Sequence, residues 1–435
     1  MPASPSLLIV PARFKTGKLY TQIATTSAGL VLGSSGDFNV TRATTATRFN
    51  SAGLIESVAS GVPRLDYYTS GGTAGCPALL VEPSAANGIL NSENTATNWT
   101  LGLNLTSGYT DVIGVSGNNL TVAVSGSNIG ASAGRLQRGS NNVALASGST
   151  YTVSFLMRQT GTHTIGGYYA VITGAAAGDL GGGFDVSGSF SSGSIYNSAG
   201  TTNRIRRVEQ WGTDVYRCSE TFTMTASGTL TVFNLAPLSG VSSASNPAVG
   251  AQIAFAAPQI ELGAVPTTFI PTTTAAVTRN AEVINLSGAV SGCIGQTEGT
   301  IYAEVDIRNL TDGRILTLFK TSAQYILLSK STNRLGGAII DTTSSPTTVV
   351  NLQTASGSLT SGIYKLALAY KQNDFAFYVN GTQVGTSNSG NVIGDYSLIR
   401  IGNFDTSLFF NDRIRAAALY TTRLTNAELA ALTTL

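Results

Sequence analysis

Asp374 to Thr386 read DFAFYVNGTQVGT, and this stretch decides which kind of fold the chain can form. Apolar and polar side chains alternate from Phe375 to Val379, as in a β-strand with one face in a core. Asn380-Gly381 interrupts the alternation, and both residue types tolerate the positive φ that a two-residue type I′ turn requires. A second short strand follows. The stretch therefore predicts a β-hairpin with its tip at Asn380-Gly381.

Strand-like alternation recurs through most of the sequence. GTIYAEVDI, at 299–307, puts Ile301 and Val305 on one face, and Tyr302, Glu304 and Asp306 on a face that we expect to be wet. YKLALAY, at 364–370, has apolar residues on both faces, which predicts a central strand covered on both sides. Together with the hairpin, these patterns predict an all-β fold.

Helical periodicity is nearly absent until the last dozen residues. RLTNAELAALTTL contains a capping box, in which Thr425 caps the first amides and Glu428 reaches back to the amide of Thr425. The segment predicts a short terminal helix, with Leu429 and Leu432 as its anchors on the sandwich.

Composition excludes several classes of partner. Charged residues make up 11% of the 435 residues, and 25 basic against 23 acidic residues give a formal charge of +2. So small a charge gives no broad field to attract a phosphate backbone, which argues against nucleic acid. No apolar stretch approaches the roughly 20 residues that span a bilayer, so membrane insertion is not expected. The apolar run near the start is broken by Pro11 and makes a poor export signal.

Three cysteines, Cys76, Cys218 and Cys293, lie far apart and cannot all pair within the chain. They argue against a disulfide framework and are predicted to be buried thiols.

The length and the pattern divide the chain into successive segments. Residues 1–88 are predicted to be a partly irregular attachment region that gains order from a partner, with a cluster of arginines at Arg42, Arg48 and Arg64. Residues 89–265 and 286–435 are predicted to be two antiparallel β-sandwiches in tandem. A Pro/Thr-rich linker, 266–285, is expected between them. The tripeptide VTR, at 40–42 and again at 277–279, is weak evidence of duplication.

Residues 286–435 resemble the concanavalin A-like lectin and laminin G-like family. GTIYAEVDI, IYKLALAYKQNDFAFYVNGTQVG, LIRIGNF and the closing IRAAALYTTRLTNAELAAL carry the resemblance, in this order. It implies two antiparallel sheets packed as a jelly roll, a fold used chiefly to bind glycans or protein surfaces.

Residues 89–265 resemble carbohydrate-binding jelly-roll modules of virion proteins and polysaccharide-degrading enzymes. The motifs are ILNSENTATNWT, YTVSFLMR, WGTDVYRCS and APQIELG. Val215 stands where the third motif usually has the first of two aromatic residues.

Residues 1–95 are similar to the N-terminal regions of tailed-bacteriophage structural proteins, namely tail fibres, head fibres and capsid-associated adhesins. DFNVTRATTATRFNSAGLIESVASGVPRLDY and CPALLVEPSAANGILNSE carry this similarity. It implies a structural protein on the virion surface, assembled in the host cytoplasm. Its first segment would bind other capsid or tail proteins, and its sandwiches would bind host cell-surface glycans. Fibres are commonly homotrimers, although no coiled coil or repeat in this sequence requires one.

A polysaccharide-degrading enzyme with accessory carbohydrate-binding modules is the alternative. Related glucanases use a strand with the pattern E-x-D-x-x-E, and here Glu304 and Asp306 supply two of the three carboxylates while Asn309 replaces the third. We favour a non-enzymatic protein, because the polar edge of a half-exposed strand looks the same. His163 is the only histidine and is predicted to be a loop residue. A third hypothesis is a bacterial surface adhesin of non-viral origin.

Exposed aromatic rings with amide and charged neighbours are the usual platform for sugar rings. The carbohydrate-binding candidates are Tyr168, Tyr169, Trp211 and Asn411. Tyr168 and Tyr169, in a stretch flanked by glycines near His163, are predicted to lie at the surface. Asp405 and Asp412, near Asn411, are candidate ligands for calcium, a hard cation that prefers oxygen. The same residue types also occur in ordinary turns.

Overall fold

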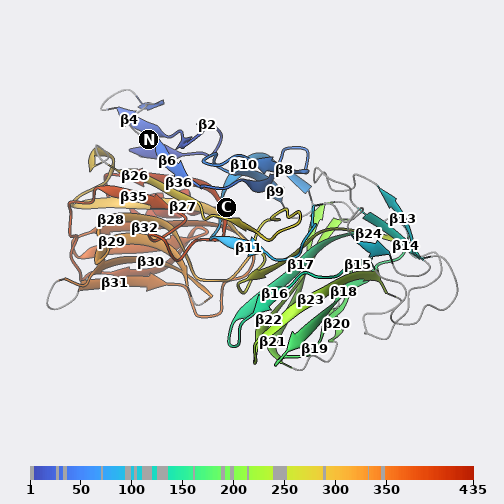
Figure 1. Ribbon diagram of the computed structural model, residues 1–435. Coiled ribbons are helices and arrows are strands. Elements are labelled where there is room, and N and C mark those ends of the chain that lie inside the picture. Colours follow the sequence, from blue (N-terminus) through green and yellow to red (C-terminus); the bar gives the residue numbers. More distant parts are fainter. Residues whose placement is uncertain are drawn as a thin grey trace.

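Two β-sandwiches lie side by side in the structure, a computed structural model shown in Figure 1. It describes residues 4–435 apart from 26–28, 33–36, 70–71, 94–98, 102–104, 110–119, 125–135, 160–161, 188–191, 196–199, 213–214, 239–251, 288–290, 332 and 344–347. The sandwich whose strands come from both ends of the chain is called the composite sandwich. The sandwich formed by β12 (Thr100–Leu101) to β24 (Gln252–Leu262), which lie between those two parts of the sequence, is called the inserted sandwich. The predicted all-β fold class is confirmed.

One sheet of the composite sandwich has the strand order β34-β33-β32-β27-β36-β1-β4-β5, with β10 also paired to β36 and β9 paired to β10. β32 lies between β33 and β27, which confirms the predicted central strand. The strands are β1 (Leu7–Ile9), β4 (Gln22–Thr25), β5 (Gly29–Leu32), β9 (Leu65–Thr69), β10 (Gly72–Val81), β27 (Glu298–Ile307), β32 (Gly362–Lys371), β33 (Asp374–Val379), β34 (Thr382–Ser387) and β36 (Asp412–Tyr420).

The facing sheet has the order β2-β3-β6-β26-β35-β28-β29-β30-β31. Its strands are β2 (Phe14–Lys15), β3 (Lys18–Leu19), β6 (Phe38–Thr41), β26 (Val283–Ser287), β28 (Gly313–Thr321), β29 (Gln324–Ser331), β30 (Arg334–Asp341), β31 (Thr348–Gln353) and β35 (Leu398–Ile401). A short 3-10 helix, η2 (Ser291–Cys293), follows β26.

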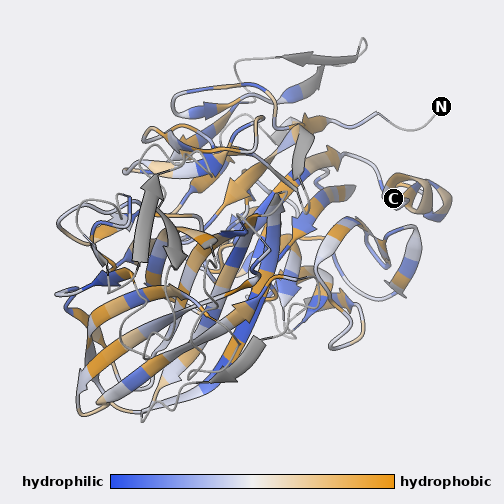
Figure 2. Ribbon diagram, turned by 90° about the vertical axis from the view of Figure 1, so that its right-hand side faces the viewer, coloured by the Kyte–Doolittle hydropathy of each residue, from blue (hydrophilic) through white to orange (hydrophobic). Residues whose placement is uncertain are grey.

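Alternation along these strands produces the core of the composite sandwich. Ile301 and Val305 of β27 and Phe375 and Phe377 of β33 are fully buried between the two sheets. Leu79 of β10 joins the same core. Figure 2 shows the corresponding bands of apolar and polar residues along the strands. Burial of this apolar surface is the main force that holds the two sheets together.

The inserted sandwich also packs two sheets face to face, with the orders β12-β15-β23-β18-β19-β20 and β13-β14-β24-β17-β22-β21, and with β16 also paired to β23. The first contains β12 (Thr100–Leu101), β15 (Leu136–Arg138), β16 (Val143–Leu145), β18 (Ile165–Gly174), β19 (Gly178–Asp185), β20 (Ser192–Ile195) and β23 (Gly228–Pro237). The second contains β13 (Leu105–Tyr109), β14 (Leu120–Val124), β17 (Thr150–Gln159), β21 (Thr201–Gly212), β22 (Val215–Met224) and β24 (Gln252–Leu262). Its core is rich in aromatic rings, among them Phe155, Phe233 and Phe255.

Residues 1–88 are folded onto the composite sandwich, which differs from the separate segment predicted from the sequence. β1 pairs with β36 through Leu7 and Leu419, and β10 pairs with the other end of β36 through Leu79 and Ile414. β6 pairs with β26 in the facing sheet. The reason is burial: the apolar faces of these short strands complete a core that the C-terminal strands alone leave open.

Two small two-stranded ribbons are separate from the four large sheets. β7 (Ala46–Phe49) pairs with β8 (Ile55–Val58), and β11 (Ala85–Asn87) pairs with β25 (Val277–Arg279). The chain enters the inserted sandwich just after β11 and returns just before β25. The β11–β25 ribbon therefore ties together the two connections between the sandwiches.

The first part of the segment 266–285 is packed into the structure, which corrects the expectation of a linker: residues 267–270 and Thr272 are buried, whereas 273–278 are exposed. Amides of this segment donate to side chains from both sandwiches: Thr268 N donates to Glu82 Oε1 at 2.8 Å, and Ile270 N donates to Gln259 Oε1 at 2.7 Å. Thr267 N donates to Glu261 Oε1 at 2.8 Å. Pro and Thr are common in linkers, but here the threonines lie in a polar seam with partners on β24, close in the sequence, and at Glu82, far away in it.

The outer face of the first composite sheet is covered, so the prediction that it is wet is wrong. α2 (Asn426–Thr433) lies over this face, and Leu429 is fully buried in a second apolar cluster with Tyr302 of β27. Leu432 is partly buried against the same cluster, and the capping box of Thr425 and Glu428 is present as predicted. We expected this face to be exposed to solvent because Tyr302, Glu304 and Asp306 have polar atoms. A tyrosine ring is mostly apolar, however, and Tyr302 packs under the helix.

The hairpin of β33 and β34 is formed as predicted. Asn380 has φ of 48° and Gly381 has φ of 79°, the left-handed values that a type I′ turn needs. The side chain of Asn380 also accepts a hydrogen bond from the amide of Lys365 on β32 at 2.9 Å. Gly381 N donates to Thr433 Oγ1 at 3.1 Å, so the turn also contacts the terminal helix.

All three cysteines have free thiols. Cys218 and Cys293 are buried, as predicted, whereas Cys76 is exposed and corrects that prediction. It lies in β10 where the register with β9 shifts between Thr73 and Ala78. No described helix has the length and apolar character needed to cross a membrane.

Candidate functional site

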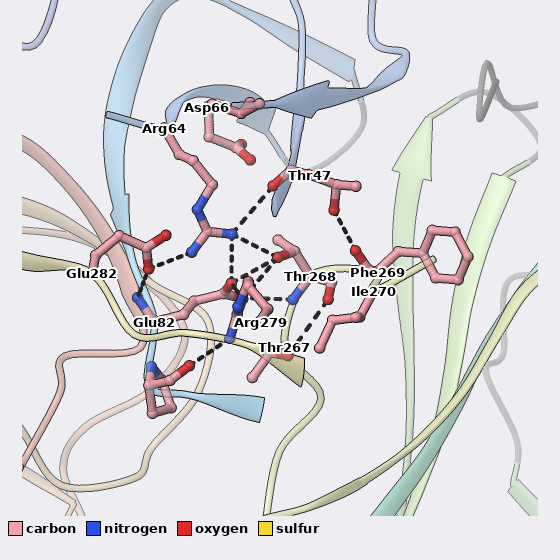
Figure 3. Close-up of polar contacts among 12 residues, drawn as sticks. Thr47, Arg64, Asp66, Glu82, Thr267, Thr268, Phe269, Ile270, Arg279 and Glu282 are labelled. Carbon is pink, nitrogen blue, oxygen red and sulfur yellow. Dashed lines mark hydrogen bonds and ion pairs between the residues drawn. The ribbon is translucent and has the colours of Figure 1, made fainter. Parts of the chain in front are cut away.

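The seam between the sandwiches contains a buried network of charged side chains (Figure 3). Arg64 lies at its centre and is fully buried. Its Nη1 donates to Glu82 Oε2 at 2.7 Å, and its Nη2 donates to Glu282 Oε2 at 2.6 Å. Further bonds reach Thr268 Oγ1 at 2.7 Å and the carbonyl oxygen of Thr47 at 3.2 Å. The guanidinium therefore joins the N-terminal segment to both flanks of β25.

Two more arginines complete the network. Arg279 pairs with Glu82, and Arg42 Nη1 pairs with Glu282 Oε1 at 3.0 Å. Arg42 and Arg279 are the last residues of the two VTR tripeptides, so both copies place an arginine in the same cluster. The arginines noted from the sequence are thus structural: Arg42 and Arg64 are buried here, and Arg48 forms a half-exposed pair with Glu56.

The charges in this network shift one another's pKa values. Burial alone would raise the pKa of Glu82, but Arg279 and Arg64 outweigh it and hold that pKa well below its usual value. Burial would likewise lower the pKa of Arg64, but Glu282 and Glu82 outweigh it and raise that pKa. Glu82 and Arg64 therefore remain ionised near neutral pH.

An apolar cluster lies beside the network and includes residues of the N-terminal segment, the inserted sandwich and the segment that follows β24. Phe49 of β7, Trp211 of β21 and Phe269 of the connecting segment are all buried in it. The rings of Phe49 and Trp211 meet edge to face, with centroids 4.7 Å apart. The guanidinium of Arg217 lies over the Trp211 ring at 4.9 Å. This cluster and the ion network hold the two sandwiches together.

Two adjoining hollows open along the seam, and together we call them the seam groove. The smaller, of about 50 Å³, is lined by Leu80, Glu82, Arg207, Glu209, Trp211, Arg217, Val265, Pro266, Thr268, Arg308, Asn309, Asn411, Asp412 and Arg413. The larger, of about 300 Å³, is lined by Pro83, Ser84, Ala85, Leu262, Gly263, Ala264, Val265, Thr267, Thr311, Asp312, Leu408, Phe409 and Asn411. Val265 and Asn411 line both. A volume near 300 Å³ is at the lower end of small-molecule sites.

The structure brings two of the four predicted carbohydrate-binding residues to this groove. Trp211 and Asn411 are 200 residues apart in the sequence and line the same hollow. Trp211 is only 8% exposed and is packed by Phe49 and Arg217, so it forms a wall and not an open stacking platform. Asn411 has φ of 53°, a left-handed conformation that asparagine tolerates.

The two tyrosines lie elsewhere. Tyr168 of β18 is 2% exposed and stacks on Phe233 in the core of the inserted sandwich, with centroids 5.6 Å apart, so its predicted surface position is wrong. Tyr169, the next residue, points to the opposite side of the strand and is half-buried. The glycines around the tyrosine pair led to the prediction of a surface position, but these glycines belong to two long paired strands, β18 and β19.

The two aspartates predicted as calcium ligands have cationic partners. Asp412 is buried and accepts from Lys330 Nζ at 2.6 Å and from the amide of Arg308 at 2.9 Å. Burial raises the pKa of Asp412, although Lys330 opposes the rise. Asp405 is exposed and pairs with Arg400 at 2.9 Å. An ammonium group already neutralises Asp412, and the described residues contain no group of three His, Cys, Asp or Glu able to hold a metal, so these residues do not fit a calcium site.

The alternative catalytic pair is also engaged. Glu304 Oε1 accepts from Arg415 Nε at 2.6 Å, and Asp306, which is buried, pairs with Arg308 at 2.8 Å. Neither residue lines the seam groove. His163 lies in a loop, as predicted, where Nε2 contacts the carbonyl oxygens of Ile165 and Leu238.

Several groove residues were missed by sequence reasoning. Leu262 is 66% exposed and Leu408 is 40% exposed, although both are apolar. Leu408 also has a left-handed φ of 49°. Arg207 lies in RIRRVE, a run rich in charged residues that is typical of any solvated strand. A run of this kind gives no signal of a groove that needs residues from three distant segments.

No protein-family model and no curated protein matches this chain. Among solved structures, it is similar to the CBM40 module of the Ruminococcus gnavus IT-sialidase, with 15% identity over 32% of this chain and 85% of that one and a TM-score of 0.28. Domains LG4-5 of the mouse laminin alpha1 chain match at 11% identity over 68% of this chain and 92% of that one, with a TM-score of 0.25. A SAP-like pentraxin of Limulus polyphemus matches at 16% identity over 31% of this chain and 69% of that one, with a TM-score of 0.24. These likenesses are to lectin-like β-sandwich folds and concern the fold alone.

Proposed function

We propose that this chain is a non-enzymatic glycan-binding protein displayed on the virion of a tailed bacteriophage, as a head fibre, capsid decoration or tail fibre. The observation that carries glycan binding is the seam groove, in which apolar and hydrogen-bonding side chains from both sandwiches line one hollow. Leu262 and Leu408 offer apolar surface to the C-H face of a sugar, and Ser84, Thr311 and Asn411 offer polar groups to its hydroxyls.

A rigid seam suits a display protein. The buried charges and the cluster around Trp211 fix the walls of the groove before a ligand arrives, which lowers the entropy lost on binding. Weak binding at each groove is sufficient on a particle, because many copies raise avidity by about 10² to 10⁴.

The virion location rests on the sequence resemblance of residues 1–95. In this proposal, the outer surface of that region contacts capsid or tail proteins after assembly in the host cytoplasm. Because its strands are part of the composite sandwich, the attachment surface and the groove belong to one folded unit.

The absence of catalysis in this proposal is supported by the pairing of Glu304 with Arg415 and of Asp306 with Arg308. Retaining hydrolysis needs one carboxyl group with a raised pKa and a second about 5 to 5.5 Å away, both free to act on the sugar. Both carboxylates are engaged by guanidinium groups, so neither is free to act on a sugar.

The test of glycan binding uses the full chain and a panel of bacterial polysaccharides and oligosaccharides. We expect retention of at least one saccharide with no release of reducing ends. Leu262→Ser should weaken binding, while Ile205→Ser, which removes another exposed apolar side chain from the same sandwich, should leave it unchanged. Release of reducing ends that Glu304→Gln abolishes would establish the enzyme instead.

The test of location is imaging of phage particles labelled with an antibody to this chain. Label on the head or tail surface is expected. Unlabelled particles, with label on the bacterial envelope, would favour the non-viral adhesin.

A further inference from the structure

The small hollow of the seam groove contains one arginine that differs from its neighbours. Arg308 pairs with Asp306 and Arg413 pairs with Asp66, at 2.8 and 3.0 Å. Arg217 donates to the carbonyl oxygen of Thr267 and lies over an indole ring. The side chain of Arg207, whose backbone pairs with β22, has no hydrogen bond or ion pair with any residue that the structure describes. Its guanidinium is therefore available to an anion.

Asn411 is the second unused group. The backbone carbonyl oxygen of Asn411 accepts a hydrogen bond from the side chain of Asn309. The side-chain amide of Asn411 has no hydrogen bond within the described part of the chain. It lines both the small and the large hollow. An amide at this junction can donate to a group in either hollow.

Among the carboxylates of the small hollow, Glu82 and Asp412 have cationic partners, whereas Glu209 has no ion pair with a described residue. Glu82 pairs with Arg64 and Arg279, and Asp412 pairs with Lys330. Glu209 accepts a long hydrogen bond of 3.4 Å from the indole nitrogen of Trp211. Arg207 and Glu209 lie two residues apart on one side of β21, but no ion pair joins these two described residues.

The sizes of the two hollows suit different parts of one ligand. A cavity needs roughly 10–15 Å³ to hold one water molecule, so the small hollow, of about 50 Å³, has room for a group as small as a carboxylate. The large hollow, of about 300 Å³, has room for the ring and offers the exposed side chains of Leu262 and Leu408.

We propose that the seam groove is specific for an acidic saccharide whose carboxylate enters the small hollow between Arg207 and Asn411 while its ring lies in the large hollow. This inference rests on the proposed glycan binding and adds the class of ligand. Arg207 binds the carboxylate through charge-assisted hydrogen bonds, which are the stronger kind. The side-chain amide of Asn411 donates a second hydrogen bond to the carboxylate. The negative charge of Glu209 repels the carboxylate and weakens binding.

The experiment measures binding of trigalacturonic acid and of neutral galactotriose to the full chain at low salt. We expect the acid to bind at least about tenfold more tightly, and Arg207→Gln to remove that preference. Arg13→Gln is the control, because it removes the same charge from an exposed side chain outside the groove. Glu209→Gln should tighten binding of the acid severalfold, since a repulsive charge is lost.

Asn411→Asp provides a second test that preserves shape and the left-handed backbone. It should weaken binding of the acid by about tenfold or more and change binding of the neutral sugar little. Equal binding of the two sugars, or equal losses in Arg207→Gln and Arg13→Gln, would overturn the inference and leave glycan binding intact. Failure of the whole saccharide panel would overturn both.

Discussion

Replacement of Arg64 by methionine should destabilise the protein by about 3–5 kcal/mol, the usual cost of removing one partner from a buried ion pair. The guanidinium is fully buried and bonds to Glu82, Glu282, Thr268 and the Thr47 carbonyl. Methionine fills much of the volume but satisfies none of these acceptors. Both carboxylates then remain buried, each with one arginine in place of two.

Urea unfolding followed by near-ultraviolet circular dichroism measures this loss. The control is Arg48→Met, because Arg48 pairs with Glu56 at 2.8 Å in a half-exposed position. An exposed pair contributes about 0–1 kcal/mol. A cycle with Glu282→Gln adds a second readout: the double variant should lose less than the sum of the two single losses, since the two side chains share one bond.

Equal midpoints for Arg64→Met and Arg48→Met would refute this reasoning. So would strict additivity in the cycle with Glu282→Gln. Either result would mean that apolar contacts around Trp211, and not the buried charges, hold the seam.

Two further predictions concern the hairpin and the pH dependence of stability. Gly381→Val should destabilise the protein by about 1 kcal/mol or more, because φ is 79° and an added Cβ would lie 3.2 Å from Thr434 Oγ1. Thermal melting measures the loss, with Gly139→Val as the control, because an added Cβ there meets nothing within 4 Å. An unchanged melting temperature of Gly381→Val would contradict the turn assignment. Glu82 has a lowered pKa in the folded state, so its contribution is present above its unfolded pKa of about 4.5 and is lost as pH falls below that value. The stability gap between the wild type and Glu82→Gln should therefore be constant from pH 7 to about 5 and narrow in more acid solution; a gap that stays constant down to pH 3 would contradict the ionised network.

Several features of this protein follow from the sequence because short-range chemistry decides them. The turn at Asn380-Gly381 needs only two residues that tolerate positive φ, and the cap of α2 needs only Thr425 and Glu428, three positions apart. Alternation with period two predicts strands wherever one face is buried. These properties predicted the all-β class, the central strand and the terminal helix.

The tertiary structure alone decided which strands pair and where a groove forms. Leu7 pairs with Leu419 across nearly the whole chain, and Arg42 and Arg279 bury their charges in one cluster. Alternation along a strand predicts that one face is buried, but many different segments could cover that face. The choice depends on which distant surfaces complete a core and satisfy every buried charge at once, so no local pattern in the sequence encodes it.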